Sequence, residues 1–253
     1  MAENISSNVL FHFTDSMDRL KSILRHGFSP HFCPEFTLDP ADVEAANSKR
    51  PPMRAAPMVC FCDLPLSLIH KHLKEYGNFG IGLDKDWGLE NGIAPVIYTY
   101  ARAQTHPAIM QLITKASEIK DRIMAINLNL LAAYTKPFVG PAWRHNRVEP
   151  SVRFYDEREW RYIPSVREGE AIFLKRNDYD KGSKAKQSNK RFKPLLVTPK
   201  AIQYLIVAGD EDENDVLELH DYIMKLYVRR FSRKDAVLVG TTIMTVDRIQ
   251  EDI

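Results

Sequence analysis

Twice near its start, the chain carries an apolar, strand-like stretch that runs directly into a helix-like stretch ending at a glycine. The first strand is predicted at Val9–Thr14, and its helix runs from Asp15, the expected N-cap, to Gly27. The second strand is predicted at Pro57–Asp63, and the helix after it ends at Gly77. This order of elements favours a sheet flanked by helices.

The rest of the chain continues the mixture of strands and helices. We expect strands at Phe79–Leu83, Pro95–Tyr100, Ile202–Ala208 and Ala236–Gly240, a helical segment at about 107–134 and a helix at Val216–Arg230. Apolar residues of the helical segment, such as Ile123, Ile126 and Leu130, should pack it on the sheet. Residues 28–57 and 135–152 are predicted to be connections, because proline recurs in them without a sustained period.

The composition is that of an ordinary globular protein. Of the 253 residues, 44% are hydrophobic, which is ample for a buried core. Lys and Arg (35) nearly balance Asp and Glu (33), so the net charge indicates neither a nucleic-acid partner nor a membrane partner. No window approaches the roughly 20 apolar residues that span a bilayer. Three cysteines, an odd number for a disulfide framework, complete the expectation of a soluble cytoplasmic protein.

The most unusual stretch is Arg153–Pro164, an aromatic and charged segment that is predicted to be a strand. On a strand, Glu157 and Glu159 share one face, while Trp160 and Tyr162 lie on the other face and hold the glutamates by packing. Two like charges on one face repel each other unless cations or a ligand compensate them. From this stretch alone, an exposed edge strand whose Glu and Arg residues pair in water is favoured over a carboxylate that acts on a substrate.

Three further groups of residues suggest binding sites. His12 and Thr14 share one face of a strand that ends at a helix N-terminus, which suits an anionic or ribose-bearing ligand, although a strand histidine is more often structural. A set of Cys and His residues has the ligand types of a zinc site, but zinc is not expected because only one residue separates the ligands within each half of the set. A basic loop at residues 175–193 is either a solvated insertion or a contact for nucleic acid. The zinc set is His31, Cys33, Cys60 and Cys62, and the basic residues are Lys175, Arg176, Lys184, Lys186, Lys190 and Arg191.

Four blocks of sequence, taken in order, resemble the AbiGi family of abortive-infection phage-resistance proteins. The blocks are LFHFTDSMDRLKSILRHGF, PMVCFCDLPLSLI, YGNFGIGL and FYDEREWRYIP, and the resemblance covers about residues 9–210. The family is described as the antitoxin half of a two-gene phage-defence system. The resemblance therefore implies a protein partner encoded by a neighbouring gene.

The same order of motifs is more distantly similar to the ADP-ribosyltransferase fold. That similarity implies a set that binds NAD and a catalytic pair of glutamates, of which the second stabilises the positive charge that develops on the ribose and the first orients or deprotonates the acceptor. The NAD-binding set is His12, Thr14, Tyr76 and Phe79, and the catalytic pair is Glu157 and Glu159. The middle strand, VCFCD, departs from the Ser or Thr run of many transferases.

We therefore predict an α+β, ADP-ribosyltransferase-like fold with a mixed, mostly antiparallel split sheet and flanking helices. It forms a single domain over residues 1–253, with a helical insertion at about 105–136 and the basic loop at about 175–193. The leading hypothesis is a phage-defence protein that transfers ADP-ribose from NAD or consumes NAD. The alternatives are a non-catalytic antitoxin that keeps this fold and binds a partner toxin, and a protein that binds or modifies nucleic acid.

Overall fold

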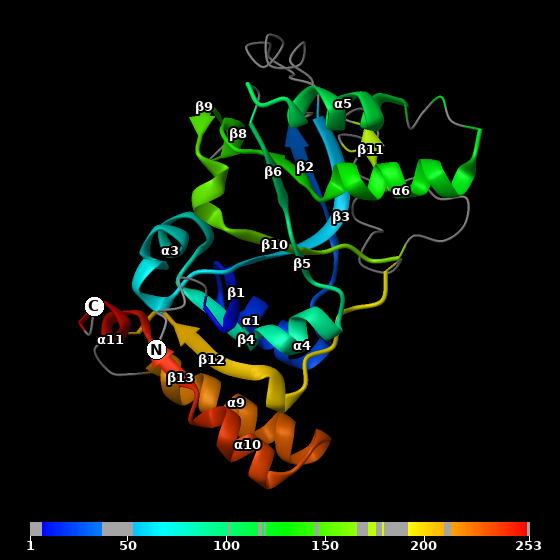
Figure 1. Cartoon of the computed structure of the whole chain (residues 1–253). Coiled ribbons are helices and arrows are strands. Elements are labelled where there is room, and N and C mark those ends of the chain that lie inside the picture. The colour runs from blue at the N-terminus through cyan, green and yellow to red at the C-terminus, as the bar shows by residue number, and fades with distance from the viewer. Residues whose placement is uncertain are drawn as a thin grey trace, which may run out of the picture. The chain divides into compact units, whose positions relative to one another are not determined.

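The computed structural model is a mixed α+β structure with a mostly antiparallel sheet and flanking helices, as the sequence predicts (Figure 1). It describes residues 7–36, 53–100, 102–115, 118, 120–144, 147–165, 172–175, 179, 192–209 and 214–251. Contacts divide the chain into two compact units. Unit 1 comprises Met1–Ser29, Cys60–Ala94 and Pro194–Ile253, and unit 2 comprises Pro30–Val59 and Pro95–Lys193.

The first strand of the chain lies inside the sheet of unit 1. The strands of this unit are β1 (Val9–Thr14), the end of β3 (Met53–Cys62), β4 (Phe79–Asp84), β12 (Ile202–Val207) and β13 (Ile243–Thr245). Strand β4 pairs with β1 and β12 with β4, both antiparallel, and β13 adds to β12 in parallel. On its other side, β1 meets β3 where Phe11 lies opposite Cys62. Leu10 and Phe11 are both buried, so the two faces of β1 are covered.

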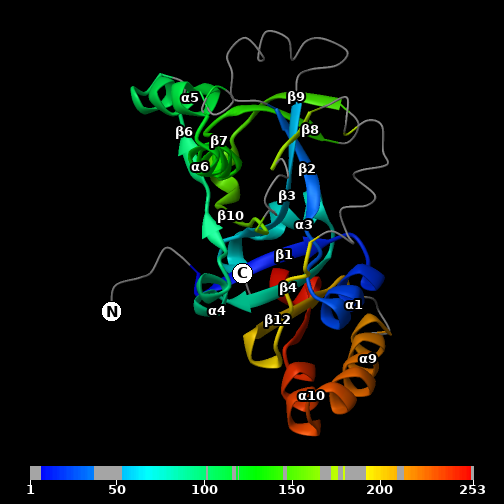
Figure 2. The same cartoon turned by 90° about the vertical axis from the view of Figure 1, so that its right-hand side faces the viewer.

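Helices supply those covers. They are α1 (Met17–His26), η2 (Leu66–Leu68), α3 (His70–Tyr76), α4 (Lys85–Glu90), η4 (Pro199–Ala201), α9 (Asn214–Arg230), α10 (Arg233–Gly240) and α11 (Val246–Glu251). Leu73 of α3 and Ile249 of α11 pack in one core cluster with Phe11. Helices α1, α9 and α10 lie together, and the Tyr222 hydroxyl of α9 donates a hydrogen bond to the Lys21 carbonyl of α1 (Figure 2).

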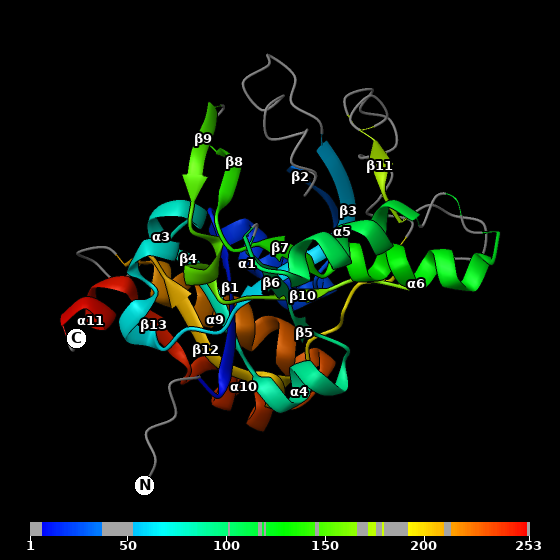
Figure 3. The ribbon, with the colours of Figure 1, turned by 45° about the horizontal axis from the view of Figure 1, so that its top comes forward.

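Unit 2 combines short strands with two helices. The elements are β2 (His31–Phe36), the first part of β3, β6 (Ile97–Thr99), α5 (Thr105–Lys115), α6 (Arg122–Ala133), β7 (Thr135–Pro137), β8 (Gly140–Arg144), β9 (Arg147–Val152), η3 (Phe154–Glu157), β10 (Glu159–Tyr162) and β11 (Leu174–Lys175), while β5 (Ala94–Pro95) crosses the boundary between units. Strands β2 and β11 both pair antiparallel with β3, β6 pairs in parallel with β7, and β8 and β9 form a hairpin (Figure 3).

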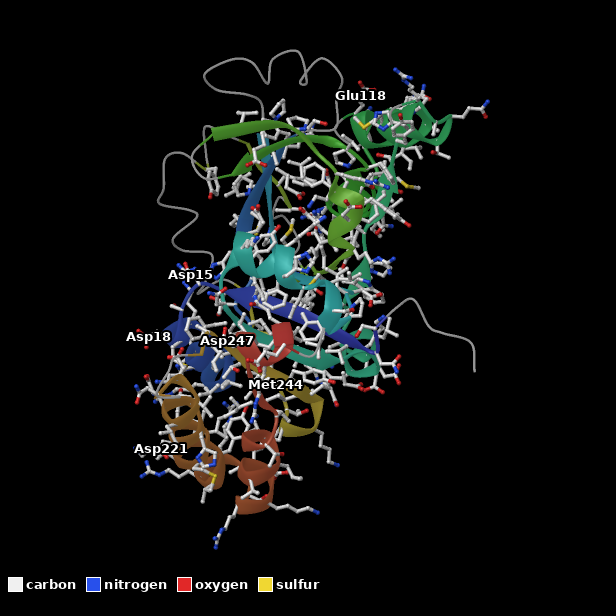
Figure 4. The ribbon with its side chains drawn as sticks, turned by 90° about the vertical axis from the view of Figure 1, so that its left-hand side faces the viewer. Asp15, Asp18, Glu118, Asp221, Met244 and Asp247 are labelled. Carbon is white, nitrogen blue, oxygen red and sulfur yellow. The ribbon has the colours of Figure 1, made fainter. Side chains whose placement is uncertain are left out.

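The ends of the first two helical stretches follow the sequence pattern with one change. Gly27 and Gly77 close α1 and α3 at φ 79° and 111°, and a Cβ at Gly77 would lie 2.4 Å from the Thr14 carbonyl oxygen. The N-cap of α1 is Ser16, whose hydroxyl accepts from the Arg19 N–H, and not Asp15. Asp15, which lies at the surface (Figure 4), instead forms an exposed ion pair with Arg19.

Predictions for four segments outside Arg153–Pro164 are wrong, three in the type of element and one in its packing. The connections at 28–57 and 135–152 contain β2, the start of β3 and β7 to β9, because short strands interrupted by proline and glycine carry too little period to be recognised. The predicted strand at Ala236–Gly240 is part of α10, where Ser232 caps the Asp235 N–H at 3.0 Å. The stripe at 107–134 does not all pack on a sheet: Ile123 is 73% exposed, and Ile126 and Leu130 are exposed as well.

One buried hydroxyl in the core of unit 1 has no hydrogen-bond partner among the described residues. It belongs to Tyr227 of α9, which has no exposed surface. We expect Tyr227→Phe to leave the free energy of unfolding unchanged or to raise it by up to about 1–3 kcal/mol, because the hydroxyl is desolvated without compensation. The control is Tyr222→Phe on the same helix, which loses a 3.1 Å hydrogen bond and about 1 kcal/mol. Urea denaturation measures both; a loss for Tyr227→Phe as large as that for Tyr222→Phe contradicts the expectation.

Candidate functional site

The stretch Arg153–Pro164 is not one strand, yet its two glutamates converge. Phe154–Glu157 forms the 3-10 helix η3, β10 starts at Glu159, and Arg158 between them adopts φ 43°, the one non-glycine residue with positive φ in the described part of the chain. This left-handed residue turns the chain. As a result, Oε2 of Glu157 and Oε2 of Glu159 both accept hydrogen bonds from Lys136 Nζ, at 2.8 and 2.6 Å.

Arg161 of β10 lies at the centre of the same group of charges. Its Nε donates to Glu159 Oε1 at 2.8 Å and its Nη2 to Glu159 Oε2 at 3.1 Å. Its terminal amino groups also hold both carboxylate oxygens of Glu35, in the fork geometry that arginine forms with a carboxylate, and Nη1 donates to the Ala133 carbonyl at 2.6 Å. We call Glu35, Lys136, Glu157, Glu159 and Arg161 the charge cluster; all five belong to unit 2.

Opposite charges in the cluster decide its protonation. Burial raises the pKa of Glu159, but the charges of Arg161 and Lys136 outweigh burial and hold that pKa well below its usual value. Burial likewise lowers the pKa of Lys136, but Glu159, Glu157 and Glu35 outweigh it and raise that pKa well above its usual value. Glu159 and Lys136 are therefore ionised throughout the neutral pH range, in a cluster where three acidic side chains face two basic ones.

The charged face of β10 is the buried one. Glu159 is 6% exposed and Arg161 is 0% exposed, whereas Trp160 and Tyr162 on the other face are half-buried. Cations compensate the like charges, which is one of the two alternatives that the sequence left open, but the exposed edge strand that pairs in water is wrong because Glu159 and Arg161 are buried. Trp160 and Tyr162, predicted to be the packing face, form the less buried face of the strand. Glu159 can be buried because Arg161, on the same face of the strand, supplies the opposite charge and hydrogen bonds that a buried carboxylate needs.

Backbone contacts fix the position of β10 within unit 2. The Glu159 N–H donates to the Tyr98 hydroxyl at 2.9 Å, and the Val96 N–H donates to the Glu159 carbonyl at 3.0 Å. The Tyr134 hydroxyl donates to the Arg161 carbonyl at 3.3 Å. Burial raises the pKa of Tyr98, so its hydroxyl stays neutral beside the glutamate. The carboxylate of Glu159 is thus held on a rigid strand.

The predicted NAD-binding residues all lie in unit 1. His12 is half-buried in β1, where Nδ1 lies 2.8 Å from the Cys60 carbonyl oxygen and the ring meets the Phe28 ring edge-on with centroids 5.0 Å apart. Thr14 is buried at the end of β1, opposite Phe79 at the start of β4. Tyr76, the last residue of α3, is 44% exposed. His12, Thr14 and Phe79 are thus brought together around β1, whereas the two glutamates belong to unit 2.

The weighed zinc and nucleic-acid sites gain no support from the described residues. His31 is exposed, the Cys33 thiol lies 3.6 Å from the His31 carbonyl oxygen, and Cys62 is buried in the apolar cluster around Phe11. No group of three or more His, Cys, Asp or Glu residues that could hold a metal ion occurs within the described ranges. Of the predicted nucleic-acid contacts, only the backbone of Lys175 is described; Arg176, Lys184, Lys186, Lys190 and Arg191 lie outside the described residues.

Sequence reasoning missed two members of the charge cluster. Glu35 lies in the proline-rich segment that is predicted to be a loop, and Lys136 in a predicted connection. Neither position has a local sequence pattern that indicates its role, because Glu35 and Lys136 contact residues of β10 that lie 126 and 23 positions away. Arg161 does carry one, since it lies two residues after Glu159 on the same strand face.

The comparison with family models covers three of the four sequence blocks quoted above, and the first block lies before the match. A family described as "Putative abortive phage resistance protein AbiGi, antitoxin" matches residues 29–208, which is more than half of the chain. The chain belongs to the AbiGi family. A curated relative from Lactococcus lactis subsp. cremoris, "Abortive phage resistance protein AbiGi", is 35% identical over 136 residues, which cover 47% of this chain and 55% of the relative. The chain thus spans about half the length of this AbiGi relative. No solved structure matches the chain.

The description of the AbiGi family is one of abortive phage resistance. The family match begins at residue 29, after His12 and Thr14, and includes the whole charge cluster. No described helix is long and apolar enough to cross a membrane.

The charge cluster should contribute strongly to stability. We expect Glu159→Gln to lower the free energy of unfolding by about 3–5 kcal/mol, because it leaves Arg161 and Lys136 buried with too little negative charge. The control is Glu218→Gln, which breaks an ion pair whose glutamate side chain is 56% exposed and should cost less than about 1 kcal/mol. Urea denaturation measures both, and equal losses would show that the cluster is not a structural centre.

The same cluster predicts a dependence of stability on pH. Because the pKa of Glu159 is lower in the folded protein than its usual 4.5, its contribution is present above pH 4.5 and is lost as the pH falls below that value. The contribution of Lys136, whose folded pKa is raised, is lost as the pH rises above 10.5. The difference in unfolding free energy between wild type and Glu159→Gln should therefore shrink between about pH 7 and pH 3. A difference that stays constant or widens contradicts the ionised, paired state of Glu159.

Proposed function

We propose that the chain acts in abortive phage infection as a binding protein that neutralises a partner toxin, without turning over a substrate of its own. The observation that carries the proposal is the state of Glu159. Its Oε1 accepts from Arg161, and its Oε2 accepts from both Arg161 and Lys136. A glutamate that stabilises positive charge on a ribose must present its carboxylate to the substrate. Here the carboxylate is occupied by side chains of its own unit.

The family supports the same proposal. AbiGi proteins are described as antitoxins, which act through a partner. The charge cluster fits this role as a scaffold, because its ion pairs join β2, β7, η3 and β10 through side chains that are at most 33% exposed. The partner is expected to be the product of a neighbouring gene.

The second candidate is an NAD-dependent ADP-ribosyltransferase or NAD-consuming enzyme with the ADP-ribosyltransferase-like fold. One observation favours it: the carboxylates of Glu157 and Glu159 converge on a single atom, Lys136 Nζ, so that displacement of this side chain would leave two carboxylates at one point. In that case His12, Thr14, Tyr76 and Phe79 would bind the dinucleotide. Contact between nucleic acid and the basic loop at 175–193 stays a prediction.

Co-expression with the product of the adjacent gene tests the proposed function. We expect the two proteins to co-purify through affinity and size-exclusion steps, and phage-infected cells carrying the toxin alone to lose viability that this chain restores. The same purified protein is incubated with adenylate-labelled NAD and infected-cell lysate. Released nicotinamide or a labelled acceptor, together with the absence of a complex, overturns the binding proposal in favour of the enzyme.

A further inference from the structure

A group of aromatic side chains in unit 2 lies partly in solvent. It comprises Tyr98 of β6, Tyr100 just after that strand, Phe138 just after β7, and Tyr155 of η3. Tyr155 stacks on Phe138 with centroids 4.9 Å apart and rings 23° from parallel, and Tyr98 and Tyr100 meet this pair edge-on at 5.4 and 5.9 Å. Tyr100 is 51% exposed and Tyr155 45% exposed. Aromatic rings left this exposed in one place are characteristic of a contact surface.

The backbone beneath these rings is fixed. The Phe138 N–H donates to the Thr99 carbonyl at 2.7 Å, and the Tyr155 N–H donates to the Phe138 carbonyl at 3.4 Å. Each ring also packs on a neighbouring ring, which restricts its rotamers. The rings therefore lose little conformational entropy when a partner covers them, which favours binding.

Arg153 adds a charged group to the same surface. Its guanidinium carbon lies 5.3 Å from the centroid of the Phe138 ring, and its Nε lies 3.2 Å from Oδ1 of Asp156. The side chain is 60% exposed, and Nε, not either of its two terminal amino groups, makes the contact given for its ion pair with Asp156. These two groups form the fork that binds a carboxylate through two parallel hydrogen bonds.

We propose that Tyr100, Phe138, Tyr155 and Arg153, here the aromatic patch, dock the partner protein through a segment in which an Asp or Glu lies next to apolar side chains. The inference rests on the proposed function and names its surface. A carboxylate of the partner takes the open fork of Arg153, and the apolar side chains beside it cover the rings. Tyrosine and arginine are the side chains that contribute most to protein interfaces.

The charges of the patch favour a protein over a nucleic acid. Asp156 is half exposed and balances Arg153, so the patch carries no excess positive charge to attract a row of phosphates. A single carboxylate needs only the fork. Single-stranded nucleic acid, which also stacks on exposed rings, is therefore an outcome of the test and not the proposed occupant.

The test measures the affinity of the purified chain for the adjacent gene product by calorimetry. We expect Arg153→Ala and Tyr155→Ala each to weaken binding at least ten-fold at a temperature at which both variants remain folded. The matched controls are Arg19→Ala, an exposed arginine that also pairs with a nearby aspartate, and Phe231→Ala, an aromatic residue that is 39% exposed in unit 1. Both controls should bind within two-fold of wild type.

The other outcomes separate the two proposals. If wild type binds the gene product and the patch variants bind it equally well, the docking surface is overturned and the proposed function stands. No binding by wild type overturns the proposed function and the docking surface with it. Binding of a fluorescent single-stranded oligonucleotide that Arg153→Ala abolishes, with the gene product unaffected, overturns the protein occupant.

A photo-crosslinker identifies the docked segment. With p-benzoylphenylalanine in place of Tyr100, we expect irradiation to join the chain to one peptide of the adjacent gene product, and mass spectrometry to find an Asp or Glu beside apolar residues in it. The same crosslinker in place of Phe231 should give no such product. A peptide without an acidic residue, or equal crosslinking from both positions, contradicts the proposal.

Discussion

A guanidinium with no exposed surface determines how unit 2 is built. Removing the charge of Arg161 from water costs several kcal/mol, so its five N–H groups must find acceptors within the protein. Glu159, Glu35 and the Ala133 carbonyl supply them, and Lys136 adds a second positive charge beside Glu159. Segments that are far apart in the sequence are thereby required to meet at one place.

The elements that could be predicted from sequence are those with a clear period and a cap. Strands β1, β4 and β12 are apolar runs of ordinary length, and the glycines that close α1 and α3 have positive φ that other residues avoid. The strands that were missed, β2 and β7 to β9, are short and contain proline or glycine, so pairing with a neighbour and not local preference makes them strands. Ile123 lies on an apolar helical stripe and is nevertheless exposed, because such a stripe predicts a helix but does not identify the surface that packs against it.

The site could be predicted in part. Like charges at Glu157 and Glu159 require compensation, and Arg161 on the same face is its nearest source. That these charges are buried, and that Glu35 and Lys136 complete them, depends on contacts that only the folded chain creates. The expected similarity to ADP-ribosyltransferases rests on the order of residues along the chain alone, and the comparisons with known proteins do not support it. Both carboxylate oxygens of Glu159 instead accept hydrogen bonds from Arg161 and Lys136. The role of a residue type in a motif is thus decided by its neighbours in space.

The left-handed conformation of Arg158 has a consequence for reading related sequences. Because a turn and not strand alternation joins the two glutamates, their convergence depends on the residue between them. Glycine, asparagine or aspartate at that position would keep the turn, while valine or isoleucine would strain it and separate the carboxylates. A homologue can therefore retain both glutamates and still lack the charge cluster. The residue between the two glutamates distinguishes homologues that form the cluster from those that do not.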